Sequence, residues 1–274
     1  MLLAQLKPII EKLGLTKPIL WTSLPTAADL CGNLDEAAVV YYCGDDFNSL
    51  AGVDHETVSN HERKLAEKAH LILGASEEIC KKFDGLKTAH IPHGVDYELF
   101  NTSISRARDL PLDGKPIAGF YGSISQWLDY KLIAQVCLDN PHWNFVFIGP
   151  LELDHNPLPN FPNVFYLGPK PHRELPRYSQ HWDASMLPFL FNDQIQACSP
   201  LKLMEYLAAG TPVVTTPFPA LAPYRSHVSI ANDARQFSQS LNQVLSIENT
   251  DTEIVRRDSW DARSRVVNQL LESL

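Results

Sequence analysis

The sequence lacks the cysteine patterns that mark a disulfide framework or a structural zinc site. Its five cysteines are widely spaced, and no two of them form a Cys-x-x-Cys pair. They are Cys31, Cys43, Cys80, Cys137 and Cys198. We therefore expect small, mostly buried thiols and a reducing, cytoplasmic compartment.

Basic charge and long apolar runs are also scarce. Lys and Arg total 23 against 32 Asp and Glu, so the formal net charge is −9. An acidic chain without a basic run is a poor candidate for binding nucleic acid through phosphate contacts. No uninterrupted apolar segment is long enough to span a bilayer. Residues 1–15 have the apolar spacing of an amphipathic helix, whereas a signal peptide would have an unbroken apolar region.

Several signatures of cofactor and metal chemistry are missing as well. The chain contains no phosphate-binding Walker loop, no Gly-x-Gly-x-x-Gly and no Gly-x-Ser-x-Gly. No pair of histidines has His-x-x-x-His spacing, and Asp45, Asp46 and Asp54 do not form Asp-x-Asp. We therefore predict no cofactor and no essential metal.

What the sequence does contain is an alternation of short β-rich runs with helical patterns. The expected strands are 19–24, 38–43, 71–75, 89–92, 117–121, 145–149, 164–168, 184–189 and 212–216, and helical patterns include 61–69, 130–139, 173–180 and 199–209. Near-continuous apolar strands separated by helices are typical of parallel sheets covered on both faces. We predict an α/β fold with two Rossmann-like doubly wound domains, the first incomplete.

A polar stretch without apolar periodicity divides the chain. Residues 101–115 contain Pro and Gly and are expected to be a linker. The expected domains are then 1–100 and 116–250, with a C-terminal helix over 251–274 that crosses back to the first domain.

Residues 199–216 read SPLKLMEYLAAGTPVVTT and carry the clearest local signal. Ser199 and Pro200 are favoured at a helix start, and Gly210 is favoured just past a helix end. Such a helix after a parallel strand places its N-terminus where α/β proteins bind anions. Lys202 is unfavourable near this positive helix end unless an anion offsets it. Glu205 fits either a ribose diol or a solvated pair with Lys202.

Four more segments occur in a matching order along the chain. They read VVYYCGDDF (39–47), IPHGVDYELF (91–100), GFYGSISQWLDYKLI (119–133) and NVFYLGPKPHRELPRYSQHWDASMLPF (163–189). With residues 199–216, they resemble the GT-B-fold glycosyltransferases of the glycosyl transferases group 1 type, from bacterial polysaccharide biosynthesis. The resemblance implies an acceptor side in residues 1–100 and a donor side in 116–250.

The resemblance also implies residue roles. Glu205 would hold the donor ribose, and Gly122 and Ser123 would line the phosphates. Ser199, Pro200 and Leu201 correspond to the helix N-terminus that holds diphosphate or sugar, beside Lys202. Many relatives carry a sugar-binding glutamate where this chain has Ala197. Sugar contacts are therefore expected from the loop residues Asn192, Asp193 and Gln194.

The implied activity is transfer of a sugar from a nucleoside-diphosphate-sugar to a glycan or lipid-linked acceptor. Asp45 and Asp46 follow an expected strand, so one of them is a candidate general base, with Asp46 slightly ahead; turn capping is the alternative for both. The first domain looks N-terminally shortened, so a second hypothesis is a non-catalytic nucleotide-sugar-binding module. Expected partners are the inner face of the membrane, contacted peripherally, or a separate subunit.

Overall fold

The computed structural model describes residues 2–50, 52–199, 201–247 and 250–274. These residues form two compact units. Unit 1 contains residues 1–93, 197–199 and 263–274, and unit 2 contains residues 94–196 and 200–262. Each unit is built on its own parallel sheet. Over the described residues, no helix is both long and apolar enough to cross a membrane.

Unit 1 has a four-stranded parallel sheet in the order β1-β2-β3-β4. Its strands are β1 (Ile19–Thr22), β2 (Ala38–Cys43), β3 (Leu71–Gly74) and β4 (Thr88–His90). Its helices are α1 (Leu2–Lys12), α2 (His55–Lys68) and α3 (Glu77–Lys81), with a 3-10 helix at Pro25–Asp29. Asp54 starts α2 by accepting the Thr57 N–H, which explains why this helix begins earlier than its apolar pattern.

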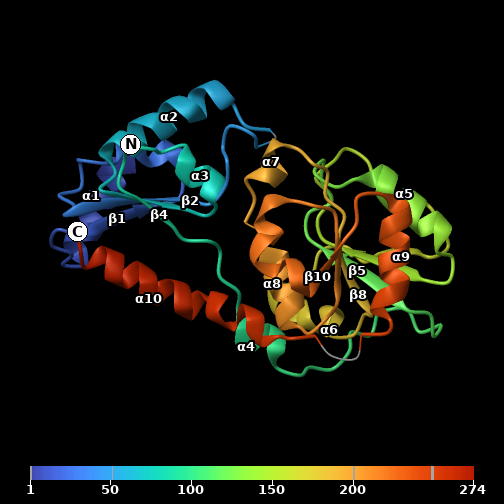
Figure 1. Cartoon of the computed structure of the whole chain (residues 1–274). Helices are drawn as coiled ribbons and strands as arrows, with labels where there is room; N and C mark the ends of the chain where they lie inside the picture. Colours follow the sequence, from blue (N-terminus) through green and yellow to red (C-terminus); the bar gives the residue numbers. More distant parts are fainter. Residues whose placement is uncertain (1, 51, 200, 248–249) are drawn as a thin grey trace. The chain divides into compact units, whose positions relative to one another are not determined.

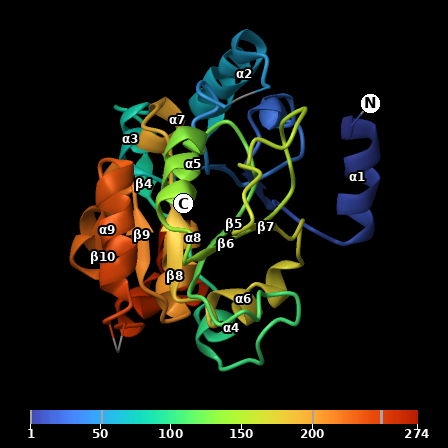
Figure 2. The same ribbon diagram turned by 90° about the vertical axis from the view of Figure 1, so that its right-hand side faces the viewer.

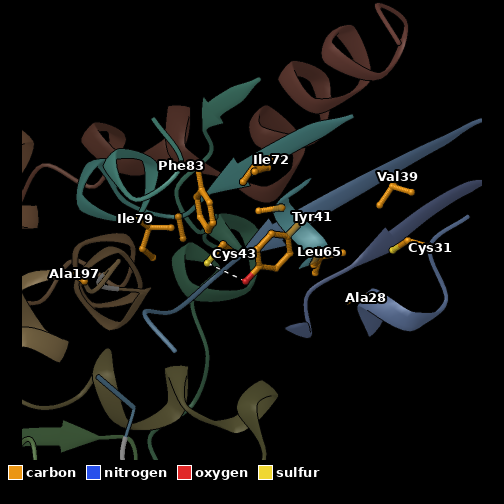
Figure 3. Packing of buried hydrophobic residues seen from close by; sticks show 12 residues of the cluster. Ala28, Cys31, Val39, Tyr41, Cys43, Leu65, Ile72, Ile79, Phe83 and Ala197 are labelled. Carbon is orange, nitrogen blue, oxygen red and sulfur yellow. Dashed lines mark hydrogen bonds between the residues drawn. The ribbon is translucent and has the colours of Figure 1, made fainter. Parts of the chain in front are cut away.

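The two faces of the unit 1 sheet carry separate apolar clusters because strand side chains alternate. On one face, Tyr41 packs with Leu65, Ile79 and Phe83 (Figure 3). On the other, Val40, Leu71, Leu73 and Ile91 pack against Val267, Leu270 and Leu271 of α10 (Trp260–Leu271). Val266 and Leu274 lie at helical spacing from Leu270, which would put the three on one face. Val266 and Leu274 are nevertheless 45% and 43% exposed, so the face that packs on the sheet is the one with Val267 and Leu271.

Unit 2 has a six-stranded parallel sheet in the order β10-β9-β8-β5-β6-β7. Figure 2 shows the strands in this order, with β10 and β7 at the two edges. Its strands are β5 (Ile117–Tyr121), β6 (Asn144–Ile148), β7 (Val164–Tyr166), β8 (Ala184–Leu187), β9 (Val213–Thr215) and β10 (Val228–Ile230). The sequence pattern predicted each of these strands except β10.

Helices cover both faces of this sheet. They are α4 (Tyr97–Asn101), α5 (Tyr130–Asp139), α6 (Pro176–Ser179), α7 (Asp193–Gln196), α8 (Leu201–Ala208) and α9 (Ala234–Val244), with 3-10 helices at His172–Glu174, Pro219–His227 and Glu253–Asp258. Helices α5 and α9 lie side by side on one face, with α8 on the other (Figure 1). This arrangement confirms the predicted doubly wound α/β class.

The segment expected to be a linker, 101–115, lies against unit 2. The Gln180 side-chain amide donates to the carbonyls of Phe100 (2.7 Å) and Thr102 (2.9 Å). The segment also buries Ala107 and Leu110. Local sequence patterns do not reveal this packing, because the partner residues lie about 80 positions away in the chain.

Candidate functional site

The unit 2 sheet has a topological switch point between β5 and β8. From β5 the chain proceeds outward through β6 and β7, whereas β8, β9 and β10 extend the sheet in the opposite direction. Crossovers on the two sides leave a crevice outside the carboxyl ends of the two central strands, where ligands bind in open α/β sheets. The turn after β5 and helix α8 after β8 both meet this crevice edge.

Gly122 follows β5 in a backbone conformation that favours glycine, with φ of +140°. A Cβ at this position would overlap the Lys202 Cε atom and lie 3.0 Å from its Nζ. The Lys202 stem therefore lies across the Gly122 turn. This contact brings together two parts of the predicted phosphate site that are 80 residues apart.

A second glycine, Gly149, makes this close approach possible. It follows β6 with φ of +143°, and a Cβ there would overlap the Gly122 carbonyl. Two neighbouring strands therefore end in glycines that pack backbone to backbone. Gly149 was not among the predicted site residues, although it is the last residue of the expected strand 145–149.

The hydrogen bonds of the turn limit what Ser123 can offer a ligand. The Gly122 N–H already donates to the Ile148 carbonyl at 2.8 Å. The Ser123 hydroxyl donates its single proton to Glu152 Oε1 at 2.6 Å. In the described part of the chain, no group accepts a hydrogen bond from the Ser123 N–H. The backbone N–H of Ser123 is thus the donor that the turn presents, and Glu152 is a neighbour that sequence reasoning missed.

Glu205 is buried on α8, with only 3% of its surface exposed. Its Oε1 atom lies 2.7 Å from Nε2 of His172, whose side chain is 54% exposed. The hydrogen bond that His172 donates to Glu205 raises the pKa of His172, despite an opposing effect of burial. The alternative of a solvated Lys202–Glu205 pair is wrong, because Glu205 is shielded from water and bonded to His172.

Aromatic side chains from β5 and α8 pack around this carboxylate. Tyr121 packs edge-on against Tyr206 at 4.7 Å between ring centroids and stacks on Trp182 at 5.8 Å. Gly119 leaves room for the Trp182 ring, which a Cβ would overlap. Burial, followed by the nearby Glu205 carboxylate, raises the pKa of Tyr121 well above its usual value. The Tyr121 hydroxyl is buried, with the Glu205 and Ser179 side chains close to it.

The predicted N-terminal anion site of α8 is only partly described. Helix α8 begins at Leu201, and Pro200 lies outside the described residues. Ser199 belongs to unit 1, where its hydroxyl accepts the His93 N–H at 3.2 Å. Gly210 has φ of +76° just past the helix, as its sequence position predicted. The roles of Ser199, Pro200 and Leu201 stay predictions.

The predicted sugar loop forms the start of α7. The side chain of Asn192 accepts the Ile195 N–H at 2.9 Å, which caps this helix. Asp193 is exposed and Gln194 is partly exposed. The Asn192 side chain therefore has a structural task at this helix start. Sugar contacts from these three residues stay predictions.

The two candidate bases lie in unit 1, after β2, and have different surroundings. Asp46 Oδ1 pairs with Lys82 Nζ at 2.6 Å, and Lys82 also contacts Glu62 at 3.2 Å. Burial acts to raise the pKa of Asp46, but hydrogen bonding and ion pairing with Lys82 lower it overall. Asp45 is exposed. A carboxylate held ionised by lysine is a weak proton acceptor, so this pairing favours a structural role for Asp46.

His172 is the main site residue that sequence reasoning missed. Histidine spacing excludes a metal motif but does not reveal this role, whereas the position of His172 after the expected strand at 164–168 is the informative signal. No group of three His, Cys, Asp or Glu side chains among the described residues is arranged to hold a metal ion. The five cysteines are free thiols.

Comparison with known proteins identifies a related domain and a shared fold. Residues 115–246 match the family model described as Glycosyl transferases group 1. TuaH of Bacillus subtilis (strain 168), named as a proposed teichuronic acid biosynthesis glycosyltransferase, is 28% identical over 90% of this chain and 70% of its own length.

Solved structures show the same fold at low identity. Anabaena Alr3699/HepE, solved with UDP and glucose, has a TM-score of 0.77 and 16% identity, covering 99% of this chain and 83% of that one. Sucrose-phosphate synthase from Thermosynechococcus elongatus has a TM-score of 0.74 and 16% identity, covering 99% and 77%. Residues 115–246 thus form a glycosyl transferases group 1 domain, and the chain has the GT-B fold of these glycosyltransferases.

Proposed function

We propose that this glycosyltransferase takes its sugar from a nucleoside-diphosphate-sugar bound at the β5–β8 crevice of unit 2. The observation that carries the proposal is the meeting of Lys202, the Gly122 turn and buried Glu205 at one crevice edge. A diphosphate and a ribose are the groups that such a cation and carboxylate would recognise. The UDP bound to HepE makes UDP the first nucleotide to test.

The diphosphate would bind over the Gly122 turn. Lys202 Nζ, the Ser123 N–H and the first turn of α8 supply positive charge and donors there. The same groups would stabilise the diphosphate as it leaves with the bond electrons. This arrangement supports the proposal that leaving-group departure needs no metal ion.

The ribose would bind at Glu205, because a carboxylate can accept hydrogen bonds from both vicinal hydroxyls. Glu205→Ala should weaken UDP binding at least ten-fold, on the order of 1–3 kcal/mol for a lost charged acceptor. Glu98→Ala is a matched control, since Glu98 is an exposed glutamate on helix α4 of the same unit. Calorimetry with UDP and GDP measures both effects. Equal UDP affinity in Glu205→Ala and wild type would remove Glu205 from the site.

The acceptor is proposed to be a glycan or lipid-linked sugar, in line with the polysaccharide pathway named for TuaH. Contact with a membrane surface or a separate subunit would deliver such an acceptor. Release of UDP from UDP-sugars, with and without candidate acceptors, tests this step. Nucleotide binding without any turnover would instead support a non-catalytic nucleotide-sugar-binding module.

A further inference from the structure

The buried Glu205 carboxylate depends on a small number of polar neighbours. It lies on α8 among apolar and aromatic side chains, and its Oε1 atom pairs with Nε2 of His172 at 2.7 Å. A buried carboxylate is costly unless hydrogen bonds compensate for its lost hydration. His172 is therefore well placed to decide where this carboxylate points.

The local backbone and a neighbouring ring restrict His172 itself. It opens a 3-10 helix directly after Pro171, whose ring fixes the backbone φ at −58°. The Phe100 ring meets the imidazole edge to face, with centroids 5.4 Å apart. The imidazole contacts Phe100, and its Nε2 atom bonds to Glu205. These two contacts define its orientation, although the side chain is 54% exposed.

We propose that His172 is a positioning residue for nucleotide recognition, which holds Glu205 in the orientation that receives the ribose hydroxyls. Selection of ribose over 2′-deoxyribose then depends on His172 as well as on Glu205. This inference rests on the proposed donor site. His172 acts through the carboxylate, because its Nε2 bonds to Oε1 of Glu205.

The charges around His172 favour its protonated, donating form. Glu205 of α8 and Asp96, which precedes α4, are the carboxylates that raise its pKa. The neighbouring Tyr121 hydroxyl stays neutral because its pKa is well above 10. A cationic imidazole on one oxygen orients a carboxylate more strongly than a neutral donor does.

The competing view is that His172 only fills the place of a ribose hydroxyl and leaves when the nucleotide binds. Removal of His172 would then leave UDP affinity unchanged or raise it. Under the positioning role, removal lowers the affinity for UDP more than the affinity for 2′-deoxy-UDP, which has only one of the two hydroxyls that donate to Glu205.

The experiment compares UDP with 2′-deoxy-UDP by calorimetry in wild type, His172→Leu, His172→Gln and Glu205→Ala. His155→Leu is the control, because His155 is an exposed histidine of the same unit. We expect His172→Leu to lose about three- to ten-fold in UDP affinity, the size of one hydrogen bond. Its 2′-deoxy-UDP affinity should stay within two-fold, and His172→Gln should recover most of the loss because it retains a donor.

Each ratio is measured on one variant with two ligands, so a general loss of folded protein cannot imitate the result. Equal losses for both nucleotides in His172→Leu, or no loss for UDP, would overturn the positioning role while leaving Glu205 in the site. Absence of ribose selection in wild type, or its persistence in Glu205→Ala, would overturn the proposed ribose contact together with this inference.

Discussion

Replacement of Gly122 by alanine tests whether the turn after β5 holds Lys202 in place. The added Cβ would overlap the Lys202 Cε atom, and a glycine φ of +140° is unfavourable for alanine. The backbone strain should cost about 1–3 kcal/mol of folding free energy. To relieve the overlap, Lys202 must swing away from the turn.

The effect on binding follows from the lost position of the ammonium group. A charged hydrogen bond contributes about 1.5–3 kcal/mol, so UDP affinity should fall roughly ten- to one-hundred-fold. Gly114→Ala is the matched control, since Gly114 has φ of +79° and open space around its missing Cβ. It should lose stability through backbone strain but retain UDP affinity.

The assay is calorimetric titration with UDP, after thermal unfolding has shown that each variant is folded at the working temperature. Lys202→Met and the double variant complete a cycle, in which the two changes should be strongly non-additive because they remove one interaction. If both Gly122→Ala and Gly114→Ala bind UDP with an affinity within two-fold of wild type, the turn does not position Lys202 for phosphate.

Three further outcomes follow from unit 1. Lys82→Met should lower the unfolding free energy by about 2–4 kcal/mol in urea titrations, because it leaves the Glu62 and Asp46 carboxylates without their shared cation. Adding Glu62→Gln to this variant should recover part of the lost stability. The stability that Asp46 contributes is present at neutral pH and is lost as the pH falls through its lowered folded-state pKa. Asp46→Asn should therefore reduce the fall of the melting temperature at acid pH. An unchanged fall would contradict the pairing of Asp46 with Lys82. If Asp45 deprotonates the acceptor, Asp45→Asn should reduce kcat about 10²- to 10⁴-fold with unchanged UDP affinity. A larger loss of kcat in Asp46→Asn would instead make Asp46 the general base.

Local sequence determined the elements whose signals are contained within a few neighbouring residues. The bounds of β2 and β5 equal those of the apolar runs at 38–43 and 117–121, and α5 equals the helical pattern at 130–139. Strands of a parallel sheet that is covered on both faces are buried along their whole length, so they appear in the sequence as continuous apolar runs. Strand β10 is only three residues long and partly exposed, so its pattern was too weak to predict.

The sequence by itself also determined that a cation and a carboxylate stand on one short helix after a parallel strand, within a recognisable order of segments. It left the environment of Glu205 open, and local pairing rules fitted an exposed Lys202–Glu205 pair. Only the tertiary structure showed Glu205 buried against His172, and Lys202 over the Gly122 turn. These contacts join residues 33 and 80 positions apart, and the folded sheet, with its neighbouring strands and close-packed glycines, decides them.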